Sequence, residues 1–303
     1  MPLKRFLAAC LLAALSLAGP VRASDLAGYT DVLWNHLKAL AALGPRNPGS
    51  AGYRAAQDMI RSVGARYADA VVEQEFDLLS QPDRPVRMTN LILKFNGDGK
   101  TRPLLIGAHY DTRPFADEEF NPAAHREPIQ GVNDGGSGTA ILLGLARYLK
   151  EHPPRRPVHL VFFDGEDYGA KDSSDKLLGS LHYAKTLEQQ APGTWPYAVI
   201  VVDMVGDRDL EIYKEIHSLK NARWLVDLLF DAARKKNLPQ FKEQIKYKIF
   251  DDHYPFIALG IPSVVLIDFD YPYWHTLADT LDKCSPESLA AAFAVVVEAA
   301  GEI

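Results

Sequence analysis

Hydrophobic positions along this chain follow two patterns, one with the period of a helix and one of short continuous runs. Helical spacing predicts helices over residues 31–43, 51–64, 137–150, 179–188, 222–236 and 286–300. Continuous apolar runs at 104–108, 158–163, 199–202 and 264–267 are typical of strands buried on both faces of a sheet. The alternation of helices with buried strands predicts an α/β fold with a mostly parallel central sheet.

Two more strands are expected earlier in the chain, and they complete the predicted architecture. Residues 71–78 and 86–95 are separated by a polar turn around Pro82 and Asp83, which favours an antiparallel edge pair. No Pro/Gly-rich linker divides the later elements, so residues 24–303 are predicted to form one domain. The expected fold is a single-domain α/β/α sandwich with a mixed, mostly parallel central sheet flanked by helices.

The first 23 residues do not fit that pattern. Lys4 and Arg5 precede an apolar run of about 13 residues, and the small-residue site Val21-Arg22-Ala23 follows it. That run is shorter than the roughly 20 residues that span a bilayer. We therefore expect residues 1–23 to be a cleaved signal peptide, and the mature protein to be secreted or periplasmic with no stable membrane anchor.

Charge and cysteine content change the picture in two ways. The formal charge is −6, from 33 Lys and Arg against 39 Asp and Glu, and it falls to −9 once Lys4, Arg5 and Arg22 are removed. Nucleic-acid binding is disfavoured, because it relies on an excess of basic residues.

Only Cys284 would remain after Cys10 leaves with the signal peptide, so no internal disulfide is expected. We predict a monomer stabilised by its core.

Histidines and acidic residues follow the buried strands. His109 comes directly after the first run, Glu166 and Asp167 follow the second, and Asp203 ends the third. His275 follows the fourth after a short loop, and Asp134 lies in a glycine-rich loop that opens a helix. Open α/β sheets bind ligands at the carboxyl ends of their strands. Imidazole and carboxylate ligands together are typical of a zinc-type metal site.

Each residue also has a simpler structural explanation. Asp134 would serve equally as the N-cap of the helix that follows it, and a set of acids at one edge would otherwise form a solvated acidic rim. Several carboxylates converging on one edge repel each other unless a cation is bound. The combination therefore favours a metal site over the rim.

The ordered motifs resemble a known family. These motifs are His109-Tyr110-Asp111, the Asp134 loop, Phe163-Asp164-Gly165-Glu166-Asp167, Asp203, Asp251-Asp252-His253 and Trp274-His275-Thr276. In this order they resemble the M28-type zinc aminopeptidase clan, and within it the glutaminyl cyclase branch. The resemblance implies a zinc-dependent acyltransferase that converts the N-terminal Gln of peptides or proteins to pyroglutamate and releases ammonia.

By that resemblance, Asp134, Asp167 and His275 would hold one zinc ion, Glu166 would be the acid/base, and Asp203 and Asp251 would be supporting catalytic carboxylates. Family members often carry Glu at the position of Asp167, so the shorter Asp leaves the ligand geometry open. Trp274 and Tyr271 would contact the substrate, although either aromatic residue would serve as well in the core.

Two alternatives remain open at this point. In an M28-type aminopeptidase, Asp134 would bridge two zinc ions, with His109 and Asp203 completing the second position, and Glu166 would activate water. The presence of His109 means that counting ligands does not separate the two reactions. Asp251 and Trp274 favour the cyclase. A binding protein on an inactive peptidase fold is disfavoured, because Glu166 and all the ligands are present.

Overall fold

The computed structural model describes residue 26 and residues 28–78 and 86–303. The predicted signal peptide, residues 1–23, lies outside the described residues. A six-stranded sheet in the order β1-β2-β4-β3-β5-β8 runs through the centre. Strands β4, β3, β5 and β8 are mutually parallel, whereas β2 is antiparallel to both β1 and β4. The predicted mixed, mostly parallel sheet and its antiparallel edge pair are therefore confirmed.

The strands of this sheet are β1 (Ala70–Leu78), β2 (Val86–Phe95), β3 (Leu104–His109), β4 (Val158–Phe163), β5 (Ala198–Asp203) and β8 (Ser263–Ile267). The α-helices are α2 (Tyr29–Ala42), α3 (Ala51–Tyr67), α4 (Gly136–Glu151), α5 (Leu178–Glu188), α6 (Ile216–Lys235), α7 (Tyr254–Ala258) and α8 (Pro286–Glu302). Each predicted helix corresponds to one of these, with shifts at its ends. Strands β6 (Ile212–Lys214) and β7 (Phe241–Ile245) form a separate parallel pair.

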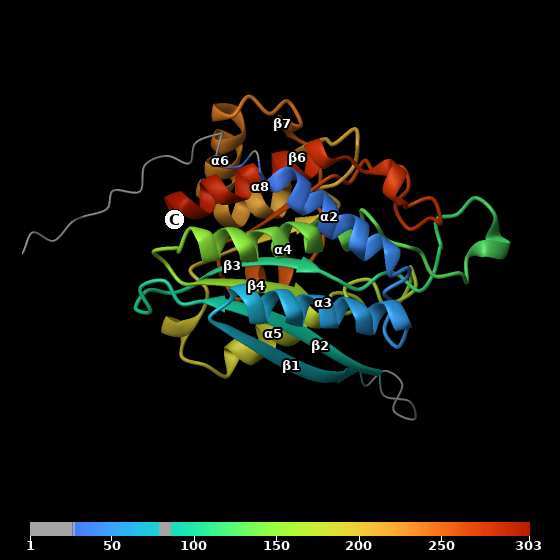
Figure 1. The fold of residues 1–303 in the computed structure, drawn as a ribbon, viewed down its shortest axis with the longest axis horizontal. Helices are drawn as coiled ribbons and strands as arrows, with labels where there is room; N and C mark the ends of the chain where they lie inside the picture. The colour runs from blue at the N-terminus through green and yellow to red at the C-terminus, as the bar shows by residue number, and fades with distance from the viewer. Residues whose placement is uncertain (1–25, 27, 79–85) are drawn as a thin grey trace, which may run out of the picture.

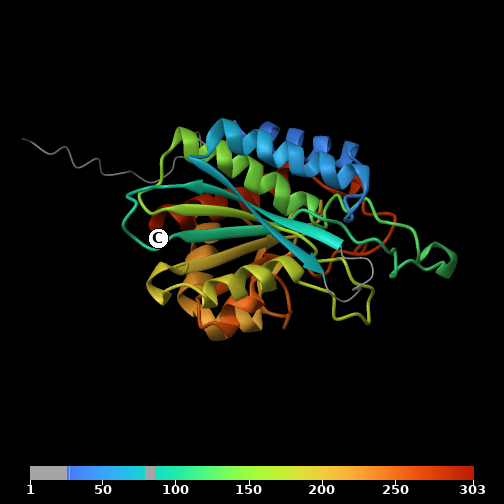
Figure 2. The same ribbon diagram turned by 90° about the horizontal axis from the view of Figure 1, so that it is seen from below.

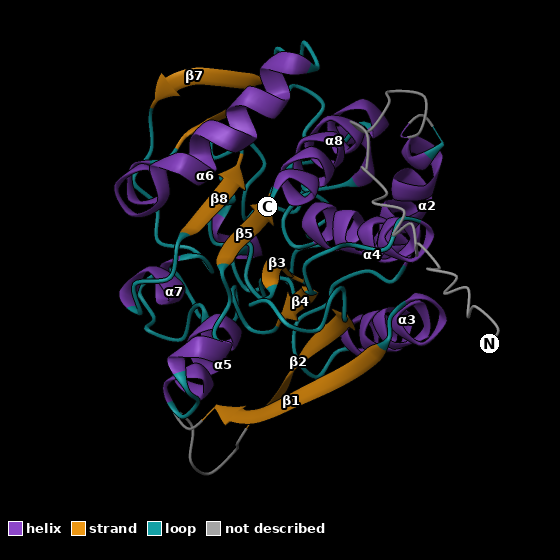
Figure 3. Ribbon diagram, turned by 90° about the vertical axis from the view of Figure 1, so that its left-hand side faces the viewer, coloured by secondary structure: helices purple, strands orange, loops and turns teal. Residues whose placement is uncertain are grey.

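Helices cover both faces of the sheet, as the sequence predicts for a three-layer sandwich. Helices α2, α3, α4 and α8 lie on one side, and α5 and α7 lie on the other (Figures 1 and 3). Viewed from below, these layers enclose the twisted strands (Figure 2). Alternate strand residues divide between two cores: Ile106 and Ile200 belong to the first, and Leu105 and Val201 to the second. This alternation follows from the two-residue period of a strand.

Helix α4 packs unusually close to the sheet because of a glycine. A Cβ atom at Gly138 would collide with the backbone oxygen of Val202 and lie 2.9 Å from the Cβ of Ala108. The first turn of α4 therefore rests directly on β5 and β3. The loop that precedes α4, which carries Asp134, is placed at the carboxyl ends of these strands as a result.

Helix α6 begins earlier than the apolar spacing predicts. The expected start was residue 222, whereas α6 starts at Ile216, and Ala222 has non-helical angles (φ −142°, ψ 55°) that mark a kink. Glu215 caps the additional turn by accepting hydrogen bonds from the backbone N–H groups of His217 and Ser218. Residues 217–221 contain only one apolar residue, Leu219, so the periodic pattern detects only the later part of the helix.

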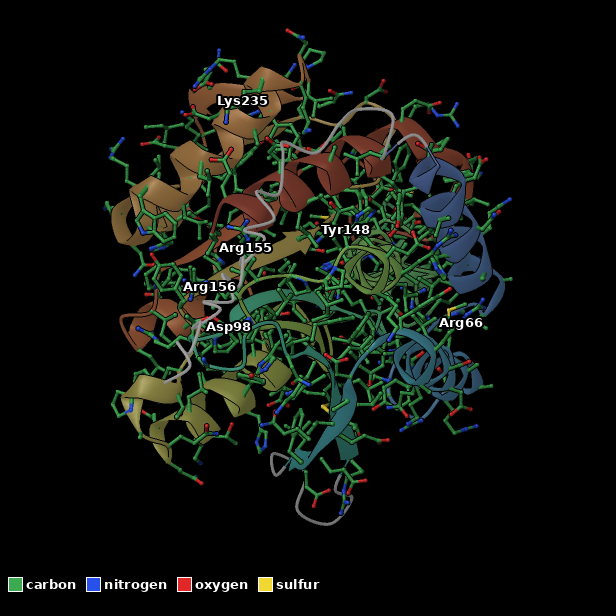
Figure 4. The ribbon with its side chains drawn as sticks, turned by 60° about the vertical axis from the view of Figure 1, so that its left-hand side comes forward. Arg66, Asp98, Tyr148, Arg155, Arg156 and Lys235 are labelled. Carbon is green, nitrogen blue, oxygen red and sulfur yellow. The ribbon has the colours of Figure 1, made fainter. Side chains whose placement is uncertain are left out.

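A groove lies at the amino ends of β3 and β4, away from the predicted chemistry. Its volume is about 530 Å³, and Asp98, Tyr148, Arg155 and Arg156 line it together with the end of α8. Figure 4 shows these four side chains on one face of the molecule. Among the described residues, no helix combines the length and apolar character needed to cross a membrane.

Candidate metal and catalytic site

The carboxyl ends of the parallel strands bring the predicted histidines and acids together. His109 ends β3 and Asp203 ends β5, and the His109 Nε2 atom lies 3.1 Å from the Asp203 Oδ1 atom. Both side chains are buried. Neighbouring parallel strands present their last residues side by side, so the pairing follows directly from the topology.

Asp134 lies between two histidines. One carboxylate oxygen, Oδ1, is 3.2 Å from the His109 Nε2 atom, and the other, Oδ2, is 3.5 Å from the His275 Nε2 atom. Helix α4 is capped by Gly135 rather than by the Asp134 side chain. Gly135 has φ 75°, and a Cβ there would lie 3.0 Å from the His109 ring, so glycine allows the loop to approach this closely. The N-cap explanation for Asp134 is therefore wrong.

On its opposite side, Asp134 lies close to the other two residues that the sequence predicts as zinc ligands. His275 Nε2 lies 3.1 Å from the Asp167 Oδ1 atom. The Oδ2 atoms of Asp134 and Asp167 are both buried without a hydrogen-bond partner. Among the described residues, ligand atoms of His109, Asp134 and Asp167 all lie within 4.8 Å of one another, and the distances from His275 add this residue to the cluster. Unpartnered buried carboxylate oxygens facing imidazole nitrogens fit a bound cation, since their burial is otherwise costly.

A buried hydrogen-bond network holds the Asp134 loop. Asp279 accepts hydrogen bonds from the backbone N–H groups of Asn133 (2.8 Å) and Asp134 (3.1 Å). The Tyr271 hydroxyl donates to Asp279 at 2.8 Å, and Tyr271 is buried in the core. The structure thus places Tyr271 beneath the site, where it supports the loop. Its predicted contact with substrate stays a prediction.

His275 has a backbone conformation that is unfavourable for a non-glycine residue. Its φ is 55°, in the left-handed region. The Trp274 ring stacks on the His275 ring, with 3.9 Å between centroids. The His275 carbonyl also accepts a hydrogen bond from the backbone of Glu118. These contacts hold the histidine in place despite the strain, as is common at functional sites.

Supporting residues on the β3–α4 loop were missed by the sequence reasoning. Arg113, which is fully buried, donates two hydrogen bonds to Asp117 (both 2.7 Å) and one to Asp167 (3.3 Å). Asp117 lies 3.7 Å from the Nδ1 atom of His275. Asp111, 3.6 Å from the Nδ1 atom of His109, accepts hydrogen bonds from the backbone of Glu166 and Asp167. Asp111 stands two residues after His109 in the sequence, so its place near the site was predictable.

The charges in this site shift the ionisation of its carboxyl groups in opposite directions. Burial, and then the neighbouring Asp167, raise the pKa of Glu166 well above its usual value. Burial and Asp203 do the same to the pKa of Asp251. Burial opposes ionisation at Asp167 too, but His275 and Arg113 outweigh it and hold the pKa of Asp167 well below its usual range. The pKa values of these two adjacent residues are therefore shifted in opposite directions, upward for Glu166 and downward for Asp167.

Asp252 is a further acid that the sequence reasoning did not assign to the site. It is buried, its Oδ1 atom has no hydrogen-bond partner, and burial raises the pKa of Asp252 to about 7. Its charged neighbours include His109 and Asp203. The segment before α7 therefore contributes two adjacent carboxyl groups, Asp251 and Asp252.

Comparison with known proteins agrees with this geometry. Residues 90–300 match peptidase family M28. The chain belongs to this family. Its relatives include the glutaminyl-peptide cyclotransferase of Gloydius blomhoffii, which is 28% identical over 289 residues, covering 83% of this chain and 76% of the relative.

Similar solved structures include a protein named as a glutaminyl cyclase and one named as an exopeptidase. The glutaminyl cyclase of Tannerella forsythia superposes with a TM-score of 0.83 and 32% identity, covering 90% of this chain and 98% of that one. A Zn-dependent exopeptidase from Parabacteroides distasonis superposes with a TM-score of 0.84 and 31% identity, with the same coverage. The M28 fold is thus established, and its similar structures include both a glutaminyl cyclase and a Zn-dependent exopeptidase.

Proposed function

We propose that this protein is a zinc-dependent glutaminyl-peptide cyclotransferase, which cyclises an N-terminal Gln to pyroglutamate and releases ammonia. The observation that carries the proposal is the partly exposed Glu166, with its raised pKa, beside the buried cluster of Asp134, Asp167 and His275. The cyclotransferases and cyclases among the relatives support the same reaction.

Asp134, Asp167 and His275 are the residues proposed to hold the zinc ion. When bound, zinc supplies a Lewis acid that polarises the side-chain amide carbonyl of the substrate. The three protein ligands leave room for that oxygen, as a catalytic zinc site requires. Arg113 and Asp117 fix the orientation of Asp167 and His275 through the hydrogen bonds and charges described above.

Glu166 is proposed to move the proton. As a carboxylate it accepts a proton from the α-amine, which then attacks the amide carbon, and it returns this proton to the departing ammonia. The C–N bond of the side-chain amide breaks while the ring C–N bond forms. A raised pKa suits a group that must both take up and release a proton near neutral pH. Asp203 and Asp251 would assist by sharing protons around the reacting nitrogen.

The direct test uses two peptides with purified zinc-loaded protein, one beginning with Gln and the other with Leu. We expect a mass loss of 17 Da, equivalent to one ammonia, from the Gln peptide and no change in the Leu peptide. Release of free leucine without ammonia loss from the Gln peptide would reject the cyclase. No change in either peptide would favour a binding protein.

An aminopeptidase is the second candidate, and one observation favours it. Asp134 faces His109 with one oxygen and His275 with the other, and Asp203 stands beside His109, so two metal ions would share Asp134 as a ligand. Two metal ions would suit hydrolysis by an activated water. The ratio of zinc to protein, measured on the purified enzyme, separates one ion from two.

A further inference from the structure

Asp251 and Asp252 lie in a short segment that one glutamate contacts at both ends. At the start of this segment, the backbone N–H of Ile249 donates a hydrogen bond to the Glu215 Oε1 atom at 3.1 Å. At its end, the Nε2 atom of His253 lies 3.5 Å from the Glu215 Oε2 atom. The two oxygens of one carboxylate therefore hold the segment between them. We call Glu215, with its contacts to Ile249 and His253, the Glu215 clamp.

The carboxylate of the clamp is itself fixed by helix α6. Glu215 is the N-cap of α6, and it accepts hydrogen bonds from the backbone N–H groups of His217 (2.8 Å) and Ser218 (2.6 Å). Glu215 is buried. Burial raises its pKa, but His253 and the backbone N–H groups of His217, Ser218 and Ile249 outweigh burial and lower the pKa of Glu215 to about 2. The clamp is therefore negatively charged at neutral pH.

His253 depends on Glu215 because its ring is fully buried. Neither ring nitrogen makes a hydrogen bond within the described part of the chain, so the carboxylate of Glu215 is the polar group that faces this ring. A buried polar ring without such a neighbour is costly, which favours the position beside Glu215. The His217 ring of α6 adds contacts from outside, 5.1 Å from the Phe250 ring and 4.9 Å from the Tyr254 ring. Helix α6 therefore holds the segment on both sides of its two acids.

The backbone of this segment determines where the Asp251 carboxyl group lies. The Asp251 Oδ1 atom accepts a hydrogen bond from the backbone N–H of Asp252, and the Asp251 backbone oxygen accepts one from Tyr254 at 2.7 Å. The charge that acts most strongly on Asp251 is that of Asp203, at the end of β5. Because the Asp251 side chain is bound to its own segment, a shift of the segment would move it relative to Asp203 and the rest of the site.

We propose that Glu215 is a positioning residue for the cyclisation, which holds Asp251 at the distance from the reacting nitrogen that proton sharing requires. The inference rests on the proposed function, in which Asp251 assists Glu166. Proton transfer needs heavy atoms about 2.6–3.2 Å apart. A displacement of about 1 Å can slow a reaction about 100-fold. The contacts of Glu215 described above join it to α6 and to the segment, so its loss should slow the chemical step rather than weaken zinc binding.

The test uses Glu215→Ser, because serine is a good N-cap for α6 but is too short to reach Ile249 and His253. We expect kcat for ammonia release from a Gln-initiated peptide to fall about tenfold. KM and zinc content should stay within about twofold of the wild-type values. Glu215→Asp keeps the cap and the charge but is one methylene shorter, so it should cause a smaller loss of kcat. This second variant provides the same comparison if the serine variant does not fold.

A double-mutant cycle separates positioning from a general structural role. If Glu215 acts through Asp251, Glu215→Ser should lower kcat by less than about twofold in an Asp251→Asn background, because the carboxyl group that Glu215 positions is already absent. Losses that multiply in the double variant would overturn the proposal.

Leu229→Ala provides a matched control on the same helix. Leu229 is buried in the first core, about four turns beyond Glu215 along α6. Its truncation leaves a cavity, so the melting temperature should fall while kcat, measured well below that temperature, is unchanged. A wild-type kcat in Glu215→Ser, or an equal loss of kcat in Leu229→Ala, would reject the positioning role and leave the cyclase function intact. If the wild-type protein releases no ammonia, the proposed function fails and this inference fails with it.

Discussion

At the scale of single residues, Asp134 is the side chain that links the two halves of the candidate site. Each of its oxygens faces a different histidine, and the backbone of its loop is fixed by Asp279. Gly135 permits this close approach, so the position of one carboxylate is set by a glycine and a buried acid. The chemistry of the site therefore depends on residues that never contact a ligand.

Glu166 and Asp167 are adjacent but should respond differently to amide substitutions. We expect Glu166→Gln to lower kcat by about 100-fold or more with zinc still bound, because it removes the proton acceptor and keeps the shape. Asp167→Asn should instead weaken zinc binding, because it removes a charged ligand. Zinc content by metal analysis, together with steady-state kinetics, separates the two effects. Loss of zinc from Glu166→Gln would show that the two roles are exchanged.

Residues at strand ends could be predicted from the sequence, whereas their supports could not. His109 and Asp203 follow apolar runs, so the fold class alone places them together. Arg113 and Asp117 lie in an irregular loop without periodicity, and their contacts with Asp167 and His275 depend on how that loop folds back. Tyr271 stands four residues before His275, which places it near the site. This spacing does not tell whether its ring faces substrate or core.

At the scale of elements, the contact between α4 and the sheet sets the position of the site. The start of α4 follows Asp134 by two residues, and Gly138 rests against Val202 and Ala108. Any movement of this helix away from β5 would carry the Asp134 loop with it. The sequence indicates the helix through its spacing, but not this close approach, which depends on a glycine in its first turn.

Gly138→Ala is therefore expected to lower the free energy of unfolding by about 1–3 kcal/mol, because the new methyl group collides with the backbone of β5. It should also weaken zinc binding by displacing the loop. Thermal unfolding with and without zinc measures both. Gly301→Ala in α8 is the control, since a Cβ there meets nothing within 4 Å and alanine favours the helix. Equal behaviour of the two variants would contradict this interpretation of the helix contact.

At the scale of the whole molecule, buried acids make stability depend on pH. Burial raises the pKa of Asp164 and of Asp268 to about 7, although neither is among the proposed metal ligands. The folded protein therefore holds protons that the unfolded chain, with its usual carboxyl pKa near 4, has already released. Stability contributed by these protons is present below about pH 4 and is lost as the pH rises through 7.

We expect the melting temperature of the chelator-treated protein to fall by several degrees between pH 5 and pH 8. Asp268→Asn should flatten this dependence, because it removes one titrating group, while the exposed Asp31 in α2 gives the control variant Asp31→Asn. Differential scanning calorimetry across this pH range measures the slopes. A melting temperature that rises from pH 5 to pH 8 would contradict the assignment.

The edge position of β1 bears on how copies of this chain meet in solution. Strand β1 pairs only with β2 within the central sheet, and Glu73, Glu75 and Asp77 are exposed along it. Glu73 forms an ion pair with Arg61, and Glu75 and Asp77 form ion pairs with Arg87. A second copy adding to this edge would have to pack against this row of charged side chains, and charged residues on an edge strand oppose such pairing. The opposite edge, β8, is packed against α6 instead. The sheet thus ends in charged side chains on one side and in a helix on the other, and both features oppose edge-to-edge pairing of two sheets.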